Sequence, residues 1–453
     1  MNIIRLFKQT SLWKKLPQAK LRTVLNLENF GGAELFIHDI NDDGLPEFLW
    51  LQSKGIFKSD LYLNNKRLGA HIHHPPGDMF CLTATRVDGS VIWQYGTPFS
   101  EPDPYISHAG EMMITCCDID GDGHVEVLAL RKQELLVLEG NSGRLKNSCV
   151  LPQDNFAAVT TFCNTSNSSP VILVSVMADS YPPYTYGNPT LFLDKSLNIL
   201  HLAEHIGSGH RIPLTDADGD GAEEALLGYQ MVKSDGTILW TLDLWQGKQI
   251  DPFAQHVDQV SHFKWNGRDL FAIAGSDRLY LIDSTGVTIW SQMLPHPQYC
   301  LIGRFDSSDS RPSLFVTNRR EMMHGFDLDG HETWRRMLPE NWPMGKPNTL
   351  ARPFHKGVPA VVWHSPDLKS QDIVVYSEAG WPYGVNGSGR LCLRFPHTGE
   401  ILKPACANLP NHRPDDFGLS FSCAAYDIDR DGNEEMVIFD RRYAWIYSWP
   451  SVQ

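Results

Sequence analysis

Asp118-Ile119-Asp120-Gly121-Asp122-Gly123 is an acidic loop between two apolar runs, and its design recurs in loops that begin at Asp39, Asp216 and Asp427. Carboxylates at positions one, three and five of a tight loop can converge on one hard cation, and glycine at position six allows the sharp turn. The next acidic residue stands at position nine and not at position twelve, which excludes an EF-hand. The pattern therefore predicts calcium loops of another class.

Each loop offers oxygen ligands for Ca²⁺ at positions one, three, five and nine. The candidate metal ligands are Asp39, Asn41, Asp43, Glu47, Asp118, Asp120, Asp122, Glu126, Asp216, Asp218, Asp220, Glu224, Asp427, Asp429, Asp431 and Glu435. The alternative is a set of solvated Asp/Gly hairpin turns that hold no metal.

Short apolar runs follow the loops, for example Phe48-Leu-Trp-Leu and Met436-Val-Ile-Phe, and they are too short for helices. They predict buried strands. Weaker copies of the strand-loop-strand unit begin at Val159, Val260 and Cys300. In a further weak copy we interpret Leu350-Ala-Arg-Pro as the first strand and Ala360-Val-Val-Trp as the second. The strong and weak copies together make eight units.

Most units continue with a second hairpin that turns at Asp or Gly. Four of these hairpins end at tryptophan: Arg86–Trp93, Lys233–Trp240, Ile282–Trp290 and Phe326–Trp334. Four strands per repeat, at a period of about 40 to 50 residues, predict the blades of a β-propeller. We expect an all-β chain, one propeller domain over residues 1–453, with eight blades, or seven if one weak unit is an insertion. A strand near Leu21–Leu25 would complete the last unit and close the ring.

Composition is typical of one large globular body, because 453 residues with 42% hydrophobic content can bury a sizeable core. The net charge of -14 argues against nucleic acid as a partner. Nine cysteines at irregular spacing predict core thiols and no disulfide framework. No signal peptide or membrane-span run is visible, so we expect a cytoplasmic monomer without a membrane partner.

Polar residues precede most of the expected first strands, on the propeller face opposite the acidic loops. We call these the blade-start positions, and they are His108, Asn155, His210 with Arg211, His256 with Asp258, Gln298 with Tyr299, and Asn348. Loop insertions at about residues 52–80, 97–108 and 178–189 would share this face, and they carry His74, Tyr105, Tyr184 and Tyr186. Such loops would turn an open funnel into a pocket for a small ligand or a chain end.

The chain resembles the calcium-containing β-propeller polysaccharide lyases over roughly residues 33–450. The resemblance lies in the acidic repeats, in Gly207-Ser-Gly-His210, in His256-Val-Asp258 and His296-Pro-Gln298, and in the closing Tyr426-Asp-Ile-Asp-Arg-Asp-Gly. It is strongest for the group that contains rhamnosyl-glucuronate lyases, with rhamnogalacturonan and ulvan lyases as more distant relatives. It implies Ca²⁺ as the cofactor and an acidic rhamnose-containing oligo- or polysaccharide as the substrate.

In the lyases so related, His, Tyr and Arg on this face carry out the chemistry. Removal of the C5 proton of a uronate requires that the neighbouring carboxylate be neutralised by Arg, a protonated His or a metal. We assign that role to Arg211, and the acid and base roles to His108 and His210 with Tyr184 or Tyr186 as substitutes. Substrate binding falls to His74, Tyr105, Asn155, His256, Gln298 and Asn348.

Other interpretations stay open. The blade-start histidines could be structural hydrogen-bonding groups, Arg211 could pair with Asp216 or another calcium-loop acid, and Asp258 could cap the turn at His256. The preferred function is a lyase that cleaves a rhamnose-uronic acid linkage at a chain end. The rival is a non-catalytic calcium-stabilised propeller that binds glycans or protein. A hydrolase fits less well, because a glycosidase needs two carboxylates beside the cut bond.

Overall fold

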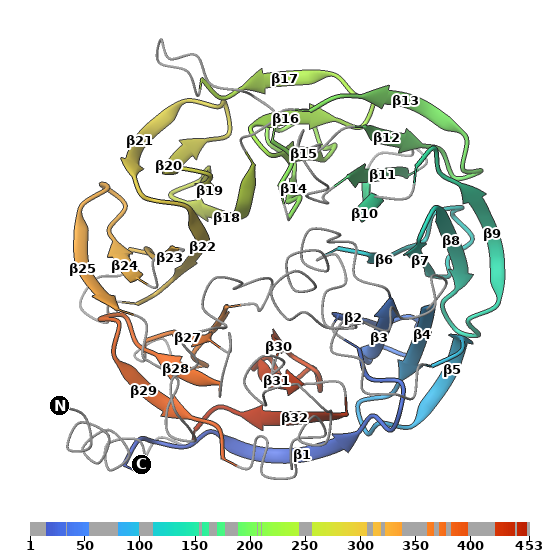
Figure 1. Cartoon of the computed structure of the whole chain (residues 1–453), viewed down its shortest axis with the longest axis horizontal. Helices are drawn as coiled ribbons and strands as arrows, with labels where there is room; N and C mark the ends of the chain where they lie inside the picture. Colours follow the sequence, from blue (N-terminus) through green and yellow to red (C-terminus); the bar gives the residue numbers. More distant parts are fainter. Residues whose placement is uncertain are drawn as a thin grey trace, which may run out of the picture. The chain divides into compact units, whose positions relative to one another are not determined.

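The computed structural model describes residues 15–32, 34–53, 80–98, 112–153, 156–162, 170–176, 189–205, 207–209, 211–243, 256–305, 311–318, 322–337, 360–366, 371–376, 382–396, 422–439 and 442–450. The strands in these residues form eight four-stranded sheets, and the described part of the chain contains no helix. The protein is an all-β, eight-bladed β-propeller, so the sequence-based count of eight is confirmed (Figure 1).

The chain divides into two compact units. The first unit comprises residues Met1–Ala33, Ser100–Ser107 and Leu301–Gln453, and the second comprises Glu34–Phe99 and His108–Cys300. The sheets of the second unit are β2 (Glu34–His38), β3 (Glu47–Ser53), β4 (Phe80–Thr85), β5 (Val91–Gly96); β6 (Ile114–Cys117), β7 (Glu126–Arg131), β8 (Glu134–Glu139), β9 (Leu145–Val150); β10 (Phe156–Phe162), β11 (Val171–Val176), β12 (Thr190–Leu193), β13 (Ile199–Ala203); β14 (Leu214–Thr215), β15 (Glu224–Leu227), β16 (Gln230–Lys233), β17 (Ile238–Thr241); and β18 (Val257–Trp265), β19 (Arg268–Gly275), β20 (Arg278–Asp283), β21 (Thr288–Met293).

The boundary between the units falls within β22. The remaining sheets are β22 (Pro297–Gly303), β23 (Ser313–Asn318), β24 (Met322–Phe326), β25 (Glu332–Met337); β26 (Val361–Trp363), β27 (Ile373–Tyr376), β28 (Tyr383–Val385), β29 (Leu391–Arg394); and β30 (Ser422–Tyr426), β31 (Glu435–Phe439), β32 (Tyr443–Ser448) with β1 (Lys20–Asn26).

One sequence-based assignment is wrong. The run Ala360-Val-Val-Trp363 forms β26, the first strand of its sheet and not the second. A short apolar run can occupy any inner position of a blade, and the sheet is already complete with β27, β28 and β29. Asn348 therefore does not directly precede a first strand, because β26 begins at Val361.

Burial follows the position of a strand in its sheet. Second strands such as β3 and β15 are buried along their whole length, whereas fourth strands such as β9 and β17 are mostly exposed. A strand buried on both faces needs apolar side chains at successive positions, and Phe48-Leu-Trp-Leu supplies them. This explains why the sequence shows continuous apolar runs directly after the acidic loops.

The second hairpins join neighbouring sheets through tryptophan. Trp240 on β17 donates from Nε1 to Ser284 O at 2.8 Å and covers Gly286, where an added Cβ would lie 2.6 Å from the indole. Gly286 also has φ 80°, a conformation that glycine adopts without strain. Trp93 makes the same bond to Gly140 O, at 2.6 Å. Trp93 and Trp240, each at the end of a hairpin motif, thus interlock with the next blade.

The N-terminal strand completes the last sheet, as expected from the sequence. β1 pairs antiparallel with β32 from Lys20↔Ser448 to Asn26↔Tyr443. Ala19 and the half-buried Leu21 and Val24 join the apolar cluster of this unit. The cysteines among the described residues are free thiols, buried or half-buried. No helix long and apolar enough to cross a membrane occurs in the described part of the chain.

Candidate functional site

The described blade-start positions lie at the N-terminal ends of β14, β18 and β22, whereas the acidic loops follow the C-terminal ends of β2, β6, β14 and β30. Several predicted site residues fall outside the described residues, and so does almost all of the three predicted loop insertions. These residues are His74, Tyr105, His108, Asn155, Tyr184, Tyr186, His210 and Asn348.

His256 precedes β18 and is held from its backbone. Its amide donates to Ser276 Oγ at 2.8 Å, and its carbonyl accepts from Ser276 Oγ at 3.0 Å and from the Tyr229 hydroxyl at 3.3 Å. Tyr229 is buried, which raises the pKa of its hydroxyl and keeps it a donor. Gly275 leaves room for that hydroxyl, since an added Cβ would lie 2.4 Å from it. The imidazole of His256 therefore projects from a fixed point.

Asp258 lies between two histidines. Its Oδ2 is 3.5 Å from His256 Nε2 and 3.4 Å from His296 Nε2. The side chains of His256, Asp258 and His296 are 13%, 10% and 17% exposed, so the cluster is mostly enclosed yet reachable. Asp258 therefore does more than cap the turn at His256. His296 begins the segment His296-Pro-Gln298, which contributes to the resemblance to the lyases, but the sequence pattern did not mark His296 itself as a site residue.

A second blade-start segment lies against this cluster. Val257 N donates to Gly207 O at 3.2 Å, and a Cβ at Gly209 would lie 2.1 Å from Val257 O. The segment that leads to Arg211 is therefore next to the start of β18. Ser208, at its centre, is buried with its Oγ 3.2 Å from Ser175 Oγ. Two of the segments that the sequence placed on one face are thus neighbours.

Arg211 is exposed. Among the described residues it forms no ion pair with Asp216, whose two oxygens accept from the amides of Gly219 and Gly221. The structural alternative of an Arg211–Asp216 pair is therefore wrong. Gln298 and Tyr299 are half-buried in β22, two and three residues beyond His296.

The acidic loops share one hydrogen-bond design. The position-nine glutamate is buried, and one of its oxygens accepts from the backbone amide at position two, as between Glu126 Oε2 and Ile119 N at 3.0 Å. The other loops repeat this bond from Ile40, Ala217 and Ile428. Burial raises the pKa of all four glutamates. One glutamate oxygen is thus committed to the backbone, and the other meets a side-chain nitrogen, of Asn41, Lys146, Lys233 or Arg22.

In three loops a basic side chain contacts the carboxylates. Lys146 Nζ on β9 lies 2.7 Å from Asp120, 2.8 Å from Glu126 and 3.3 Å from Asp122. Lys233 Nζ lies 2.7 Å from both Asp218 and Asp220. In the last loop the guanidinium of Arg22 lies 2.8 Å from Asp429 and 2.7 Å from Glu435. The sequence analysis did not detect these cations, because they come from other strands of the same sheets.

The first loop differs. Position three is Asn41, whose amide donates to Glu47 Oε1 at 2.7 Å. Asp39 Oδ1 is buried and accepts no hydrogen bond from the described residues, while Asp39 Oδ2 accepts from Gly44 N at 2.9 Å. A buried carboxylate oxygen aimed into an all-oxygen loop fits a hard cation such as Ca²⁺.

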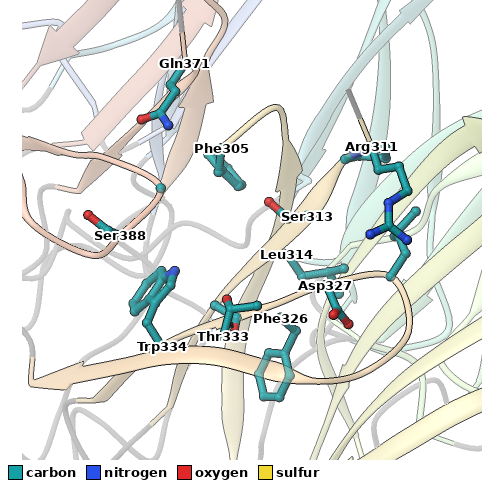
Figure 2. A pocket seen from close by; sticks show the side chains of 14 residues that line it. Phe305, Arg311, Ser313, Leu314, Phe326, Asp327, Thr333, Trp334, Gln371 and Ser388 are labelled. Carbon is teal, nitrogen blue, oxygen red and sulfur yellow. Dashed lines mark hydrogen bonds between the residues drawn. The ribbon is translucent and has the colours of Figure 1, made fainter. Parts of the chain in front are cut away.

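A cavity of about 290 Å³ lies in the first unit, at the hairpin-turn end of its sheets. Figure 2 shows Trp334, Thr333, Ser388 and Gln371 around it. The only titratable residues among those lining it are Arg311 and Asp327. The described lining therefore lacks the histidine or tyrosine that proton transfer from a uronate requires, and its polar and aromatic groups suit binding.

No protein-family model and no curated protein sequence matches the chain. Solved structures share its fold at low sequence identity. A rhamnogalacturonan lyase PL11 of Bacillus licheniformis is 14% identical, with a TM-score of 0.57 over 97% of this chain and 75% of that one. The exotype rhamnogalacturonan lyase YesX is also 14% identical, with a TM-score of 0.54 over the same shares. The biofilm matrix protein Bap1 of V. cholerae is 9% identical, with a TM-score of 0.52 over 96% of this chain and 90% of that one.

Proposed function

We propose that the protein is a polysaccharide lyase that cleaves a rhamnose-uronic acid linkage by β-elimination at a chain end. The observation that carries the proposal is a propeller like that of rhamnogalacturonan lyases over nearly the whole chain. The imidazoles and the carboxylate clustered at adjoining blade starts support it, since general acid-base chemistry uses such groups. Fold alone does not determine function, so the residues have to be tested.

The proposed mechanism uses the residues assigned from the sequence. Arg211 neutralises the carboxylate of the uronate and so stabilises the charge that develops when the C5 proton leaves. His108 and His210 act as base and acid, with Tyr184 or Tyr186 as substitutes, and each transfer contributes about 10²–10⁴-fold. His74, Tyr105, Asn155, His256 and Gln298 bind the sugar chain. Asn348 was assigned because it was expected to precede a first strand, and β26 begins only at Val361, so we leave Asn348 out.

We also propose that Ca²⁺ binds the acidic loops as a structural ion. In the first loop Asp39 offers a buried oxygen, and the ion pair of this loop joins His124 to Asp42, which is not one of the candidate ligands. The other loops have the same oxygen donors, but there the ion competes with Lys146, Lys233 or Arg22. The bound ion would tie the first strand of a blade to the second.

The test is incubation of the purified protein with acidic rhamnose-containing oligosaccharides, with the ultraviolet absorbance of an unsaturated uronate as the readout. The proposal expects an increase in absorbance and a new unsaturated product by mass spectrometry. A protein that binds these glycans without forming the product would rule out the lyase.

The alternative is a non-catalytic propeller that binds glycans. The cavity beside Trp334 favours it, because an aromatic face with nearby amide and hydroxyl groups suits a sugar ring. Trp334→Ala would weaken glycan retention on an affinity gel if this cavity binds the ligand. The lyase proposal expects no change in product formation from the same variant.

A further inference from the structure

We propose that His256, Asp258 and His296 form a binding site for a first-row divalent metal, of which Zn²⁺ is the best match. One ring nitrogen of each imidazole and one carboxylate oxygen of Asp258 lie within 4.8 Å of one another. Two imidazoles and a carboxylate are a ligand set that Zn²⁺ uses in proteins, whereas Ca²⁺ prefers oxygen ligands only. The site is therefore chemically distinct from the acidic loops.

The distances fit a metal better than direct hydrogen bonds. Zinc bonds to N and O ligands of about 2.0–2.1 Å in a tetrahedron place neighbouring ligands about 3.3–3.4 Å apart. The two distances from Asp258 Oδ2 to the Nε2 atoms are 3.5 and 3.4 Å. These exceed the usual hydrogen-bond range of about 2.7–3.2 Å. An ordinary pair between β18 and β19 provides the contrast, because His262 Nε2 lies 2.8 Å from Asp269 Oδ1.

The surroundings prepare His256 to act as a ligand. Ser276 Oγ lies 3.4 Å from its Nδ1, and in the tautomer that carries the ring proton on Nδ1 the lone pair that a metal needs is on Nε2. The backbone contacts from Ser276 and Tyr229 fix the position of the ring. A partner on the second ring nitrogen is the usual arrangement for a metal-binding histidine.

The backbone of His296 is also unusual. Its φ is 47°, in the left-handed region, and it precedes Pro297, although a following proline disfavours helical backbone conformations. Strained backbone of this kind is found at functional sites, where it aims a side chain. Here it brings the His296 ring to within 5.4 Å of the His256 ring, between centroids.

Three protein ligands leave one position open, and the partial exposure of the cluster lets water or an anion reach it. In the lyase proposed above, this position would accept a carboxylate oxygen of the uronate. That role rests on the proposed function, whereas metal binding does not.

The experiment uses the full-length protein, stripped with a chelator and then kept in excess Ca²⁺ so that the oxygen loops are saturated. Co²⁺ is titrated as a visible probe and then displaced with Zn²⁺. The proposal expects one Co²⁺ with tetrahedral visible bands and no thiolate charge-transfer band. Loss of a residue that hydrogen-bonds a metal-binding histidine costs about 10–100-fold in metal affinity, so we expect a loss in that range for Ser276→Ala. Loss of a metal ligand itself should lower the affinity by at least about 100-fold.

The variants are His256→Ala, Asp258→Asn and His296→Gly, where glycine preserves the left-handed backbone. His262→Ala is the matched control and should bind as the wild type does. Equal Co²⁺ affinity in the wild type and Asp258→Asn, or a thiolate band, would overturn the proposal. Lyase activity without metal binding would refute the metal site and leave the proposed function standing. Metal binding without lyase activity would refute the proposed function and leave the metal site standing.

Discussion

At the scale of single residues, the proposed function depends on where the backbone fixes side chains at the starts of first strands. His256 stands one residue before β18, and four contacts from Ser276 and Tyr229 hold it. The flanking strand pairs Val257 with Gly275. A side chain so placed keeps its direction without a ligand, which lowers the cost of ordering the site when a substrate binds.

Arg211→Ala tests the neutralising role. The guanidinium would stabilise charge that is largest in the transition state, so its loss should cost about 3–4 kcal/mol in kcat/KM. Folding should be unaffected, because Arg211 is exposed. The measurement is the rate of unsaturated product formation, with Arg268→Ala as a control for the loss of an exposed arginine. Unchanged kcat/KM in Arg211→Ala would exclude this residue from the chemistry.

His364 and Asp372 predict a pH-dependent contribution to stability. The hydrogen bond to Asp372 raises the pKa of His364, so the folded state holds the proton more tightly than the unfolded state. This contribution is complete below the unfolded pKa of about 6.5 and is lost as the pH rises through the folded value. Urea melts should show a larger loss of stability for His364→Gln at about pH 6 than at about pH 9. In an Asp372→Asn background the difference between the two pH values should shrink, because the largest cause of the raised pKa is lost and Glu434 remains.

Sequence reasoning located some of these residues but not their partners. His256 and Asp258 were recognisable because polar residues stood just before an apolar strand. His296 joins them through a left-handed backbone before proline, which no pattern of apolar residues encodes. Lys146 and Arg22 meet the acidic loops because of the register of fourth strands, and that register depends on β-bulges as well as on sequence spacing.

At the scale of elements, the second hairpin combines a turn with an interlock. Trp240 is half-buried and bonded to Ser284 O, so Trp240→Ala should lower the free energy of unfolding by about 2–3 kcal/mol, less than a fully buried Trp would cost. Trp240→Phe should cost about 1 kcal/mol, since chiefly the hydrogen bond is lost. Urea denaturation measures both. Ile238→Ala, at an exposed position on the same strand, should change little, and an equal loss there would contradict the interlock.

The acidic loop beside Lys146 predicts competition between an ammonium group and Ca²⁺. Lys146→Met leaves Asp120, Asp122 and Glu126 without their basic partner, and like charges then repel in a partly buried loop. The melting temperature in chelator should fall, and Ca²⁺ should restore it by a larger increment than in the wild type. Lys264→Met, at an exposed lysine, should behave as the wild type does. If Ca²⁺ raised the melting temperature of Lys146→Met and Lys264→Met by the same amount, the proposal that Ca²⁺ binds this loop would be wrong.

Element patterns were the most predictable part of the fold. Acidic loops, buried second strands and Trp-ended hairpins each combine a turn residue with an apolar run, and all of these signals are local. The misassigned strand at Val361–Trp363 shows the limit, because the segment between it and β27 lacks the Asp-x-Asp-x-Asp-Gly motif that marks a first strand elsewhere. Where a repeat lacks the acidic loop motif, composition alone cannot show which strand of the blade is the first.

At the scale of the whole molecule, one blade combines strands that are far apart in the sequence. β1 supplies the fourth strand of the sheet that contains β30, β31 and β32. Arg22 on β1 also reaches the acidic loop between β30 and β31, where it pairs with Asp429 and Glu435. The N-terminal strand therefore contributes hydrogen bonds, apolar contacts and a charge to this blade.

Deletion of residues 1–26 should consequently lower the urea midpoint, because β32 becomes an unpaired edge and the buried Leu25 is lost. A synthetic peptide of residues 15–32 should restore the midpoint in proportion to the logarithm of its concentration, since it binds only the folded chain. The same peptide with Val24→Pro lacks a backbone donor and should restore less. Deletion of residues 1–14, which keeps β1, is the matched control. If the longer deletion melts as the control does, the blade is stable without its N-terminal strand, and pairing with β1 is not what stabilises the propeller.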